Sequence, residues 1–265
     1  MKETPSTSPE TFLRQAVKIV GAAAEIARRG FGTSPIIQTK ALSDIVTEAD
    51  REVEEYVVSH LAKLYPDHGF FCEESGKRSA DAEYVWILDP IDGTKYYARG
   101  VPLYSIALSL ERRGRPLLGI VHNPQTNEVF CGAAGRGATL NGRPIRCSEA
   151  TLLDESTLCV EIPSRDLPEA QRRLGLEELG ILVDHVRRVR ILGVGALGLC
   201  YCASGGFDAY VNLRSGTTKY WDIAAGRAIL EAAGGRFFHA DEQIVAGPAE
   251  LCRQLQELLG FEKRP

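Results

Sequence analysis

The feature that most constrains the fold is a buried strand that ends on a rigid acidic turn within Trp86–Thr94. The apolar residues up to Leu88 predict a buried strand. Pro90 disfavours a helical conformation for the preceding Asp89 and fixes its own φ, so the chain leaves the strand in a defined turn. Gly93 permits a backbone conformation that a side chain would forbid. The stretch therefore predicts a strand end that presents acids and backbone amides to a ligand.

Asp89 and Asp92 are the two acids that this turn holds close together. Like charges at short range raise each other's pKa unless a cation lies between them, so the simplest interpretation is a divalent metal site. Asp, Pro and Gly are also common turn residues, and an ordinary turn is the alternative when this stretch is taken alone.

Three further acidic segments favour the metal site. Glu73 ends the strand-like run Gly69–Cys72. Thr47 and Asp50 fit the Thr-x-x-acid start of a helix, so a capping role is the alternative for Asp50. Asp222 begins a helix of small residues, which gives it an N-cap alternative.

With these residues the chain resembles the inositol monophosphatase superfamily of magnesium-dependent, lithium-sensitive phosphomonoesterases. The matching segments are Asp44–Asp50, Glu73–Ser75, Asp89–Thr94 and Trp221–Gly226, with Gly135–Ala138 and Leu140–Gly142 between them. The resemblance spans nearly the whole chain, and four motifs in the family's order are highly specific. It implies hydrolysis of a small phosphorylated substrate.

The resemblance also implies which residues hold Mg²⁺. Glu73, Asp89 and the backbone carbonyl of Ile91 match the ligands of a first ion. Asp89, Asp92 and Asp222 match those of a second, and Glu73 would help to hold a third, more weakly bound ion. Such hard oxygen ligands suit Mg²⁺, with Mn²⁺ as an alternative, and two ions can activate water and stabilise the leaving oxygen.

The same resemblance implies the catalytic groups. Thr94 and Asp50 are similar to the pair that orients and deprotonates the attacking water, and Glu73 belongs with them as a catalytic residue. Asp92 and the amides of Gly93 and Thr94 would bind the substrate at its phosphate.

The segments on the substrate side differ in part from the family pattern. Gly193 and Gly195 match the substrate-side loop. Inositol monophosphatases tend to carry a glutamate where this chain has Val211–Arg214, and Lys95 follows Thr94. The resemblance places Asn212, Arg214 and Lys95 around the non-phosphate part of the substrate. Arg214 resembles an arginine of enzymes that also accept fructose 1,6-bisphosphate, where a second phosphate needs a cation. We expect inositol 1-phosphate as substrate. The alternatives are fructose 1,6-bisphosphate, histidinol phosphate and 3′-phosphoadenosine 5′-phosphate, and a metal-binding interaction module without turnover.

Composition excludes several other classes. The net charge of −4 argues against a general nucleic-acid binder, and no apolar run has the length of a membrane span. Seven cysteines without a C-x-x-C pair indicate free thiols in a reducing cytoplasm. The basic cluster Arg187–Arg190 fits a solvated strand edge better than a phosphate-binding patch.

The order of elements predicts a mixed α/β fold. Two helices come first, strands follow, and the turns within Tyr104–Gly132 predict an antiparallel meander; the second half alternates strands and helices. The resemblance implies a layered αβαβα sandwich in one phosphatase unit, residues 1–265, with the metal site between the halves 1–150 and 151–265. It also implies a homodimer.

Overall fold

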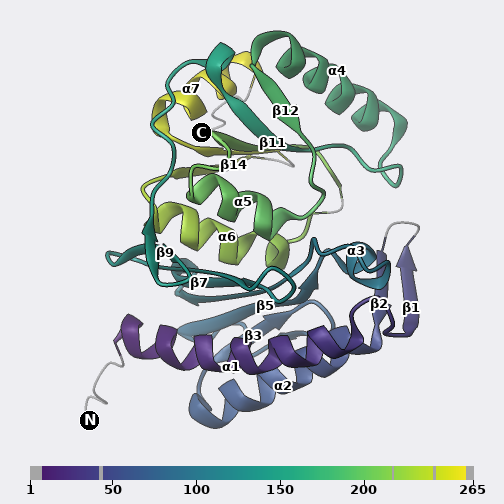
Figure 1. Ribbon diagram of the computed structural model, residues 1–265, viewed down its shortest axis with the longest axis vertical. Coiled ribbons are helices and arrows are strands. Elements are labelled where there is room, and N and C mark those ends of the chain that lie inside the picture. Colours follow the sequence, from purple (N-terminus) through teal and green to yellow (C-terminus); the bar gives the residue numbers. More distant parts are fainter. Residues whose placement is uncertain (1–7, 42–43, 217, 241–242, 261–265) are drawn as a thin grey trace.

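Two long amphipathic helices form the first layer of the molecule. The computed structural model describes residues 8–41, 44–216, 218–240 and 243–260. Helix α1 (Pro9–Gly30) has Ser8 as its N-cap. The Ser8 hydroxyl accepts a hydrogen bond from the Thr11 amide, and Pro9 occupies the first turn. Helix α2 (Glu48–Leu64) packs beside α1, and both lay their apolar faces on the first sheet (Figure 1).

An eight-stranded sheet forms the second layer, in the order β10-β9-β8-β7-β6-β5-β3-β4. Its strands are β3 (Gly69–Cys72), β4 (Gly76–Arg78), β5 (Tyr84–Asp92), β6 (Ser105–Arg112), β7 (Arg115–Asn123), β8 (Glu128–Ala133), β9 (Gly137–Leu140) and β10 (Arg143–Ile145). Strands β6, β7 and β8 form the predicted antiparallel meander. Strand β5 runs parallel to β3, and the Glu73 amide donates to the Leu88 carbonyl at 3.1 Å. The acidic ends of both strands therefore lie side by side.

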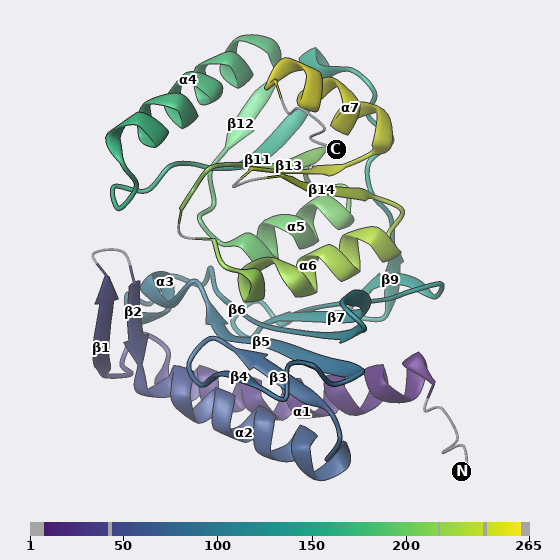
Figure 2. The same cartoon turned by 180° about the vertical axis from the view of Figure 1, so that it is seen from behind.

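Helices α5 (Gly195–Ala203) and α6 (Tyr220–Ala232) form the middle layer between the two sheets (Figures 1 and 2). Helix α6 approaches the first sheet closely at two glycines. A Cβ on Gly119 would lie 2.3 Å from the Ala225 carbonyl oxygen, and one on Gly132 would lie 2.7 Å from the Ile229 Cα. Only glycine permits this packing distance.

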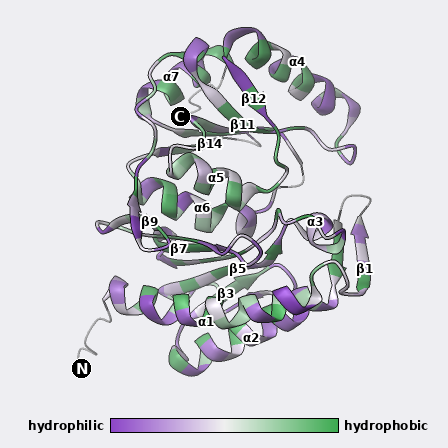
Figure 3. Cartoon of the chain, in the orientation of Figure 1, coloured by the Kyte–Doolittle hydropathy of each residue, from purple (hydrophilic) through white to green (hydrophobic). Residues whose placement is uncertain are grey.

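A five-stranded sheet and two outer helices complete the αβαβα arrangement that was predicted. The sheet order is β12-β11-β13-β15-β14, and α4 (Glu169–His185) and α7 (Ala249–Leu258) cover its outer face (Figure 2). The strands are β11 (Thr157–Glu161), β12 (Arg188–Arg190), β13 (Ala209–Leu213), β14 (Arg236–Ala240) and β15 (Gln243–Gly247), and the 3-10 turn η1 (Leu153–Glu155) precedes β11. Strand β12 is an edge strand with exposed arginines, as predicted for this basic cluster, and is largely hydrophilic (Figure 3).

Several boundaries differ from the predictions. Strand β15 was not predicted, and neither was the hairpin of β1 (Ile36–Ala41) with β2 (Asp44–Thr47) or the short helix α3 (Thr94–Ala98). The polar stretch Met1–Glu10 predicts a short tail that ends at a helix, and residues 1–7 of this stretch lie outside the described residues. No helix in the described part of the chain is long and apolar enough to cross a membrane.

Candidate active site

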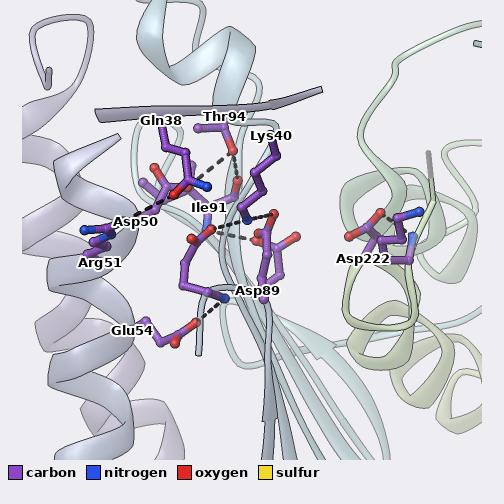
Figure 4. Close-up of polar contacts among 12 residues, drawn as sticks. Gln38, Lys40, Asp50, Arg51, Glu54, Asp89, Ile91, Thr94 and Asp222 are labelled. Atoms are coloured by element: carbon purple, nitrogen blue, oxygen red, sulfur yellow. Dashed lines mark hydrogen bonds and ion pairs between the residues drawn. The ribbon is translucent and has the colours of Figure 1, made fainter. Parts of the chain in front are cut away.

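The hydroxyl of Thr94 lies between a buried carboxylate and a backbone carbonyl. Its Oγ1 donates to the Ile91 carbonyl oxygen at 2.9 Å and lies 3.3 Å from Asp50 Oδ1 (Figure 4). Thr94 opens α3, and Gly93 before it has a φ of +93°, which turns the chain sharply out of β5. The positive φ of Gly93 therefore places this hydroxyl next to Asp50, the residue with which the resemblance groups it.

Asp50 both caps a helix and faces Thr94. Its Oδ2 accepts hydrogen bonds from the amide of Thr47, at 2.8 Å, and from the Thr47 hydroxyl. These bonds form the predicted start of α2, while Oδ1 is directed to Thr94. The structural and the catalytic interpretations of Asp50 are thus compatible, because each uses a different oxygen.

Asp89 and Asp92 are buried at the end of β5, with exposed fractions of 2% and 7%. Asp89 Oδ1 accepts from the Ile91 amide at 3.0 Å, at the register shift between Asp89 and Asp92. The strand therefore continues through Pro90 to Asp92, whereas the sequence predicted that it ends at Leu88. Asp92 Oδ2 accepts from the amide of Ala196 at 2.9 Å, in the first turn of α5. Asp92 therefore connects the first sheet to a helix of the second half.

Glu73 and Glu74 follow β3 and meet Lys40 from the β1–β2 hairpin. The Lys40 ammonium lies 2.8 Å from Glu74 Oε1 and 3.5 Å from Glu73 Oε1 (Figure 4). Glu54, one helical turn after Asp50, accepts from the amides of Glu74 and Ser75 at 2.9 and 2.8 Å. The acidic loop after β3 is thereby fixed against α2.

Asp222 approaches the same region from the middle layer, but its place in the helix differs from the prediction. Helix α6 begins at Tyr220 with Lys219 as its N-cap, so Asp222 is the third helical residue rather than the first. Its Oδ2 accepts from the Lys219 amide at 2.8 Å. The adjacent Trp221 packs edge-on against Phe71 of β3, with ring centroids 5.2 Å apart, so the two halves touch beside the site.

The carboxylates at this junction disfavour one another's ionisation. Burial raises the pKa of Asp89 and Asp92 well above the ordinary value, and neighbouring acids, Glu73 and Asp222 among them, raise both further. Burial likewise raises the pKa of Glu73 to about 8 and that of Asp50 to about 7. Cations bound at this place would relieve the repulsion.

The donor set suits a hard divalent ion, although the side chains are not gathered around one point. Carboxylates and a carbonyl are the oxygen ligands that Mg²⁺ prefers. Within the described residues, no three acid, histidine or cysteine side chains converge as they would around a bound ion. Asp222 lies apart from the Asp89 group and is turned toward its own helix start (Figure 4).

The residues expected on the substrate side lie at the edge of this region, and two of them, Asn212 and Arg214, make contacts within the protein. Gly193, with a φ of +71°, and the buried Gly195 lead into α5. The Asn212 side chain is buried and holds Ser215 and Thr218. Arg214 pairs with Glu178 of α4 at 3.4 Å.

Sequence reasoning missed three residues here. Glu54 interrupts the apolar face of α2 one turn after Asp50, and that interruption was a usable signal. Glu161 is a buried acid at the end of β11, the same pattern that singled out Glu73 and Asp89. Lys40 carries no comparable signal, because only the pairing of β1 with β2 brings it to the site.

Known proteins are similar to this chain in sequence and in fold. The family model described as "Inositol monophosphatase family" matches residues 8–259. "Inositol monophosphatase 3" of Solanum lycopersicum is 36% identical over 236 residues, which cover 87% of each chain. "Putative Nus factor SuhB" of Neisseria meningitidis serogroup B is 36% identical over 230 residues, covering 84% of this chain and 85% of that protein. The structure of inositol monophosphatase from Anabaena superposes with a TM-score of 0.82 at 31% identity, covering 96% of this chain and 97% of that one.

Proposed function

The chain belongs to the inositol monophosphatase family and is a phosphoric monoester hydrolase, and we propose that its substrate is inositol 1-phosphate or a closely related polyol phosphate. The family is generally dependent on Mg²⁺. The observation that carries the proposal is the Thr94 hydroxyl held between Asp50 and the carbonyl of Ile91, whose amide donates to the buried Asp89.

We propose that the acidic strand ends bind Mg²⁺. Glu73, Asp89 and the Ile91 carbonyl would hold one ion, and Asp89, Asp92 and Asp222 a second, with Glu73 near a third. Bound there, the ions would activate water and stabilise the leaving oxygen. The mutual repulsion of these acids supports the assignment, since it makes a cation favourable.

Asp50 and Thr94 would position and deprotonate the attacking water. A general base works best when its pKa is near the working pH, and burial raises the pKa of Asp50 to about 7. The Thr47 bonds to the other oxygen fix the orientation of the carboxylate. Gly93 and Thr94, with Asp92 beside them, would bind the phosphate at the turn.

Two observations favour a singly phosphorylated substrate over fructose 1,6-bisphosphate. Arg214, the candidate reader of a second phosphate, is already paired with Glu178. Lys95 is exposed on α3. Gly193, Gly195 and Asn212 would border the non-phosphate part of the substrate. Histidinol phosphate and 3′-phosphoadenosine 5′-phosphate remain alternatives within the superfamily.

The test is phosphate release, with and without Mg²⁺, from inositol 1-phosphate, fructose 1,6-bisphosphate, histidinol phosphate and 3′-phosphoadenosine 5′-phosphate. We expect the highest kcat/KM on inositol 1-phosphate, loss of activity on chelation, and inhibition by millimolar lithium. A preference for one of the other three would overturn the substrate assignment, and equal activity in chelator would overturn the metal assignment.

Two expectations, one from the resemblance and one from the cysteines, stay predictions. One is a homodimer, which light scattering during size exclusion can test. The other is a cytoplasmic location, which fractionation of the source cells can test.

A further inference from the structure

Two parallel strands of the second sheet end side by side at the edge of the site. Strands β11 and β13 pair in a register that places Cys159 beside Tyr210 and Glu161 beside Asn212. Because side chains alternate along a strand, all four point to the same face of the sheet. Cys159 and Tyr210 belong to the apolar cluster around α5, which identifies that face as the one toward the middle layer.

Asn212 has little hydrogen-bonding capacity left for a ligand. Its Oδ1 accepts from the Ser215 amide at 2.8 Å, and its Nδ2 donates to the hydroxyls of Thr218 and Ser215 at 2.8 and 3.2 Å. The side chain therefore organises the loop after β13.

Glu161, which pairs with Asn212 across the two strands, has one carboxylate oxygen that accepts no hydrogen bond from the described residues. The residue is 8% exposed, and its Oε1 is buried without a hydrogen-bond partner among the described residues. Burial raises the pKa of Glu161 to about 7, and the backbone amides of Val194 and Gly193, in the loop that leads into α5, partly offset this rise. A buried carboxylate oxygen without a partner is costly, and a donor supplied by a ligand would remove that cost.

The surrounding charge is negative. Burial is the largest cause that raises the pKa of both Glu161 and Asp92, and the charge of Asp222 raises both pKa values further. The Asp92 carboxylate lies at the first turn of α5, where the Ala196 amide donates to it. Arg214 is one residue beyond the end of β13, and its guanidinium meets Glu178 of α4. A second anionic group would be repelled here, whereas a neutral hydroxyl could donate to Glu161.

We propose that Glu161 is a specificity-determining residue that accepts a hydrogen bond from a hydroxyl on the non-phosphate part of the substrate. The site then selects a polyhydroxylated, singly phosphorylated compound. The inference rests on the proposed phosphatase function and adds the residue that reads the hydroxyl.

The test compares glycerol 2-phosphate with isopropyl phosphate, which differ only in two hydroxyls. The wild-type protein should prefer glycerol 2-phosphate. In Glu161→Gln a charge-assisted bond becomes a neutral one, so kcat/KM for glycerol 2-phosphate should fall about tenfold, while that for isopropyl phosphate stays the same. Equal losses on both substrates would overturn the proposal, since they would show that Glu161 only supports the Gly193–Gly195 loop.

Glu178→Gln is the matched control. Glu178 is 5% exposed, and one of its oxygens is also without a partner, but its carboxylate faces Arg214 and Gln243. This variant should leave the ratio of the two substrates unchanged. If thermal unfolding shows that Glu161→Gln is not folded, Glu161→Asp, which keeps the charge but withdraws the acceptor, should lower the ratio in the same way.

The outcome separates the inference from the proposed function. If the wild-type protein releases phosphate from neither substrate in Mg²⁺, nor from inositol 1-phosphate, the proposed function fails and the inference fails with it. If the wild-type protein is active and the ratio is the same in Glu161→Gln, only the inference fails.

Discussion

Asp50 shows how one side chain can cap a helix with one oxygen and face Thr94 with the other. Oδ2 is used by Thr47, and Oδ1 is directed to Thr94. A carboxamide at this position can still cap the helix but cannot take a proton from water.

Asp50→Asn should therefore lower kcat by about a hundredfold or more, as expected for loss of a general base, and cost at most about 1 kcal/mol of stability. Steady-state phosphate release and thermal unfolding measure the two effects. Glu48→Gln is the control, because Glu48 is an exposed acid in the same first turn of α2. Near-normal kcat with a lowered melting temperature in Asp50→Asn would leave the capping role alone.

For Asp89 we expect function and stability to be opposed. Its buried charge would serve as a metal ligand, but without a cation that charge destabilises the folded state. Asp89→Asn should abolish Mg²⁺-dependent turnover while the fold stays intact. Without metal, the variant should unfold at a higher temperature than the wild-type protein, because it no longer buries a carboxylate there and the repulsion from Glu73 and Asp92 is removed. Substantial activity at saturating Mg²⁺ would contradict the assignment of Asp89 as a ligand.

At the level of elements, the turn between β5 and α3 determines the direction in which the chain continues to Thr94. Gly93 has a φ of +93°, and a Cβ there would lie 2.8 Å from the Leu103 carbonyl oxygen. Both the backbone conformation and the close approach therefore require glycine.

Gly93→Ala should cost about 1–3 kcal/mol of stability and should lower kcat as well, because Thr94 follows directly. The matched control is Gly114→Ala in the β6–β7 turn, where φ is +72° but a Cβ meets nothing within 4 Å. The control should lose stability and keep its kcat. Equal kcat in the two variants would show that the Gly93 turn does not position Thr94.

At the level of the whole molecule, the acids between the two halves link stability to pH. Burial raises the pKa of Asp50 from 3.8 to about 7 and that of Glu73 from 4.5 to about 8. The folded state therefore binds protons that the unfolded state has released between about pH 4 and pH 8. The stabilisation is present at the acidic end of this window and is lost as the pH rises through the folded-state pKa values.

Without metal, the free energy of unfolding should fall between about pH 5 and pH 8, by on the order of 1.4 kcal/mol for each unit by which a buried pKa is raised. Saturating Mg²⁺ should reduce or reverse this slope, since the ions bind the deprotonated carboxylates of the folded state. Denaturant unfolding at several pH values, in chelator and in Mg²⁺, measures both. A flat profile in chelator would show that the acids do not repel one another as described.

The sequence by itself determined the acidic strand ends and the mixed α/β order of the elements that carry them. Strand and helix periodicities are local, and turn residues such as Pro90 and Gly93 act on their own backbone, so their positions in the chain predict where Asp89 and Thr94 lie. The family resemblance supplied the layered arrangement and the grouping of Asp50, Glu73 and Asp222 with them. The start of α6 was misjudged by two residues because the N-cap is Lys219, an unusual residue there.

Only the tertiary structure decided which of the candidate side chains already have a hydrogen-bond or ion-pair partner within the protein. Arg214 could face a second phosphate or Glu178, Asn212 could face a ligand or its own loop, and Lys40 lies far from Glu73 in the chain. Glu161 became a candidate through the register of β11 against β13 and through the absence of a partner for its Oε1 among the described residues. Such pairings depend on how separate elements pack, because a side chain's partner is set by distance in space, which no local pattern encodes.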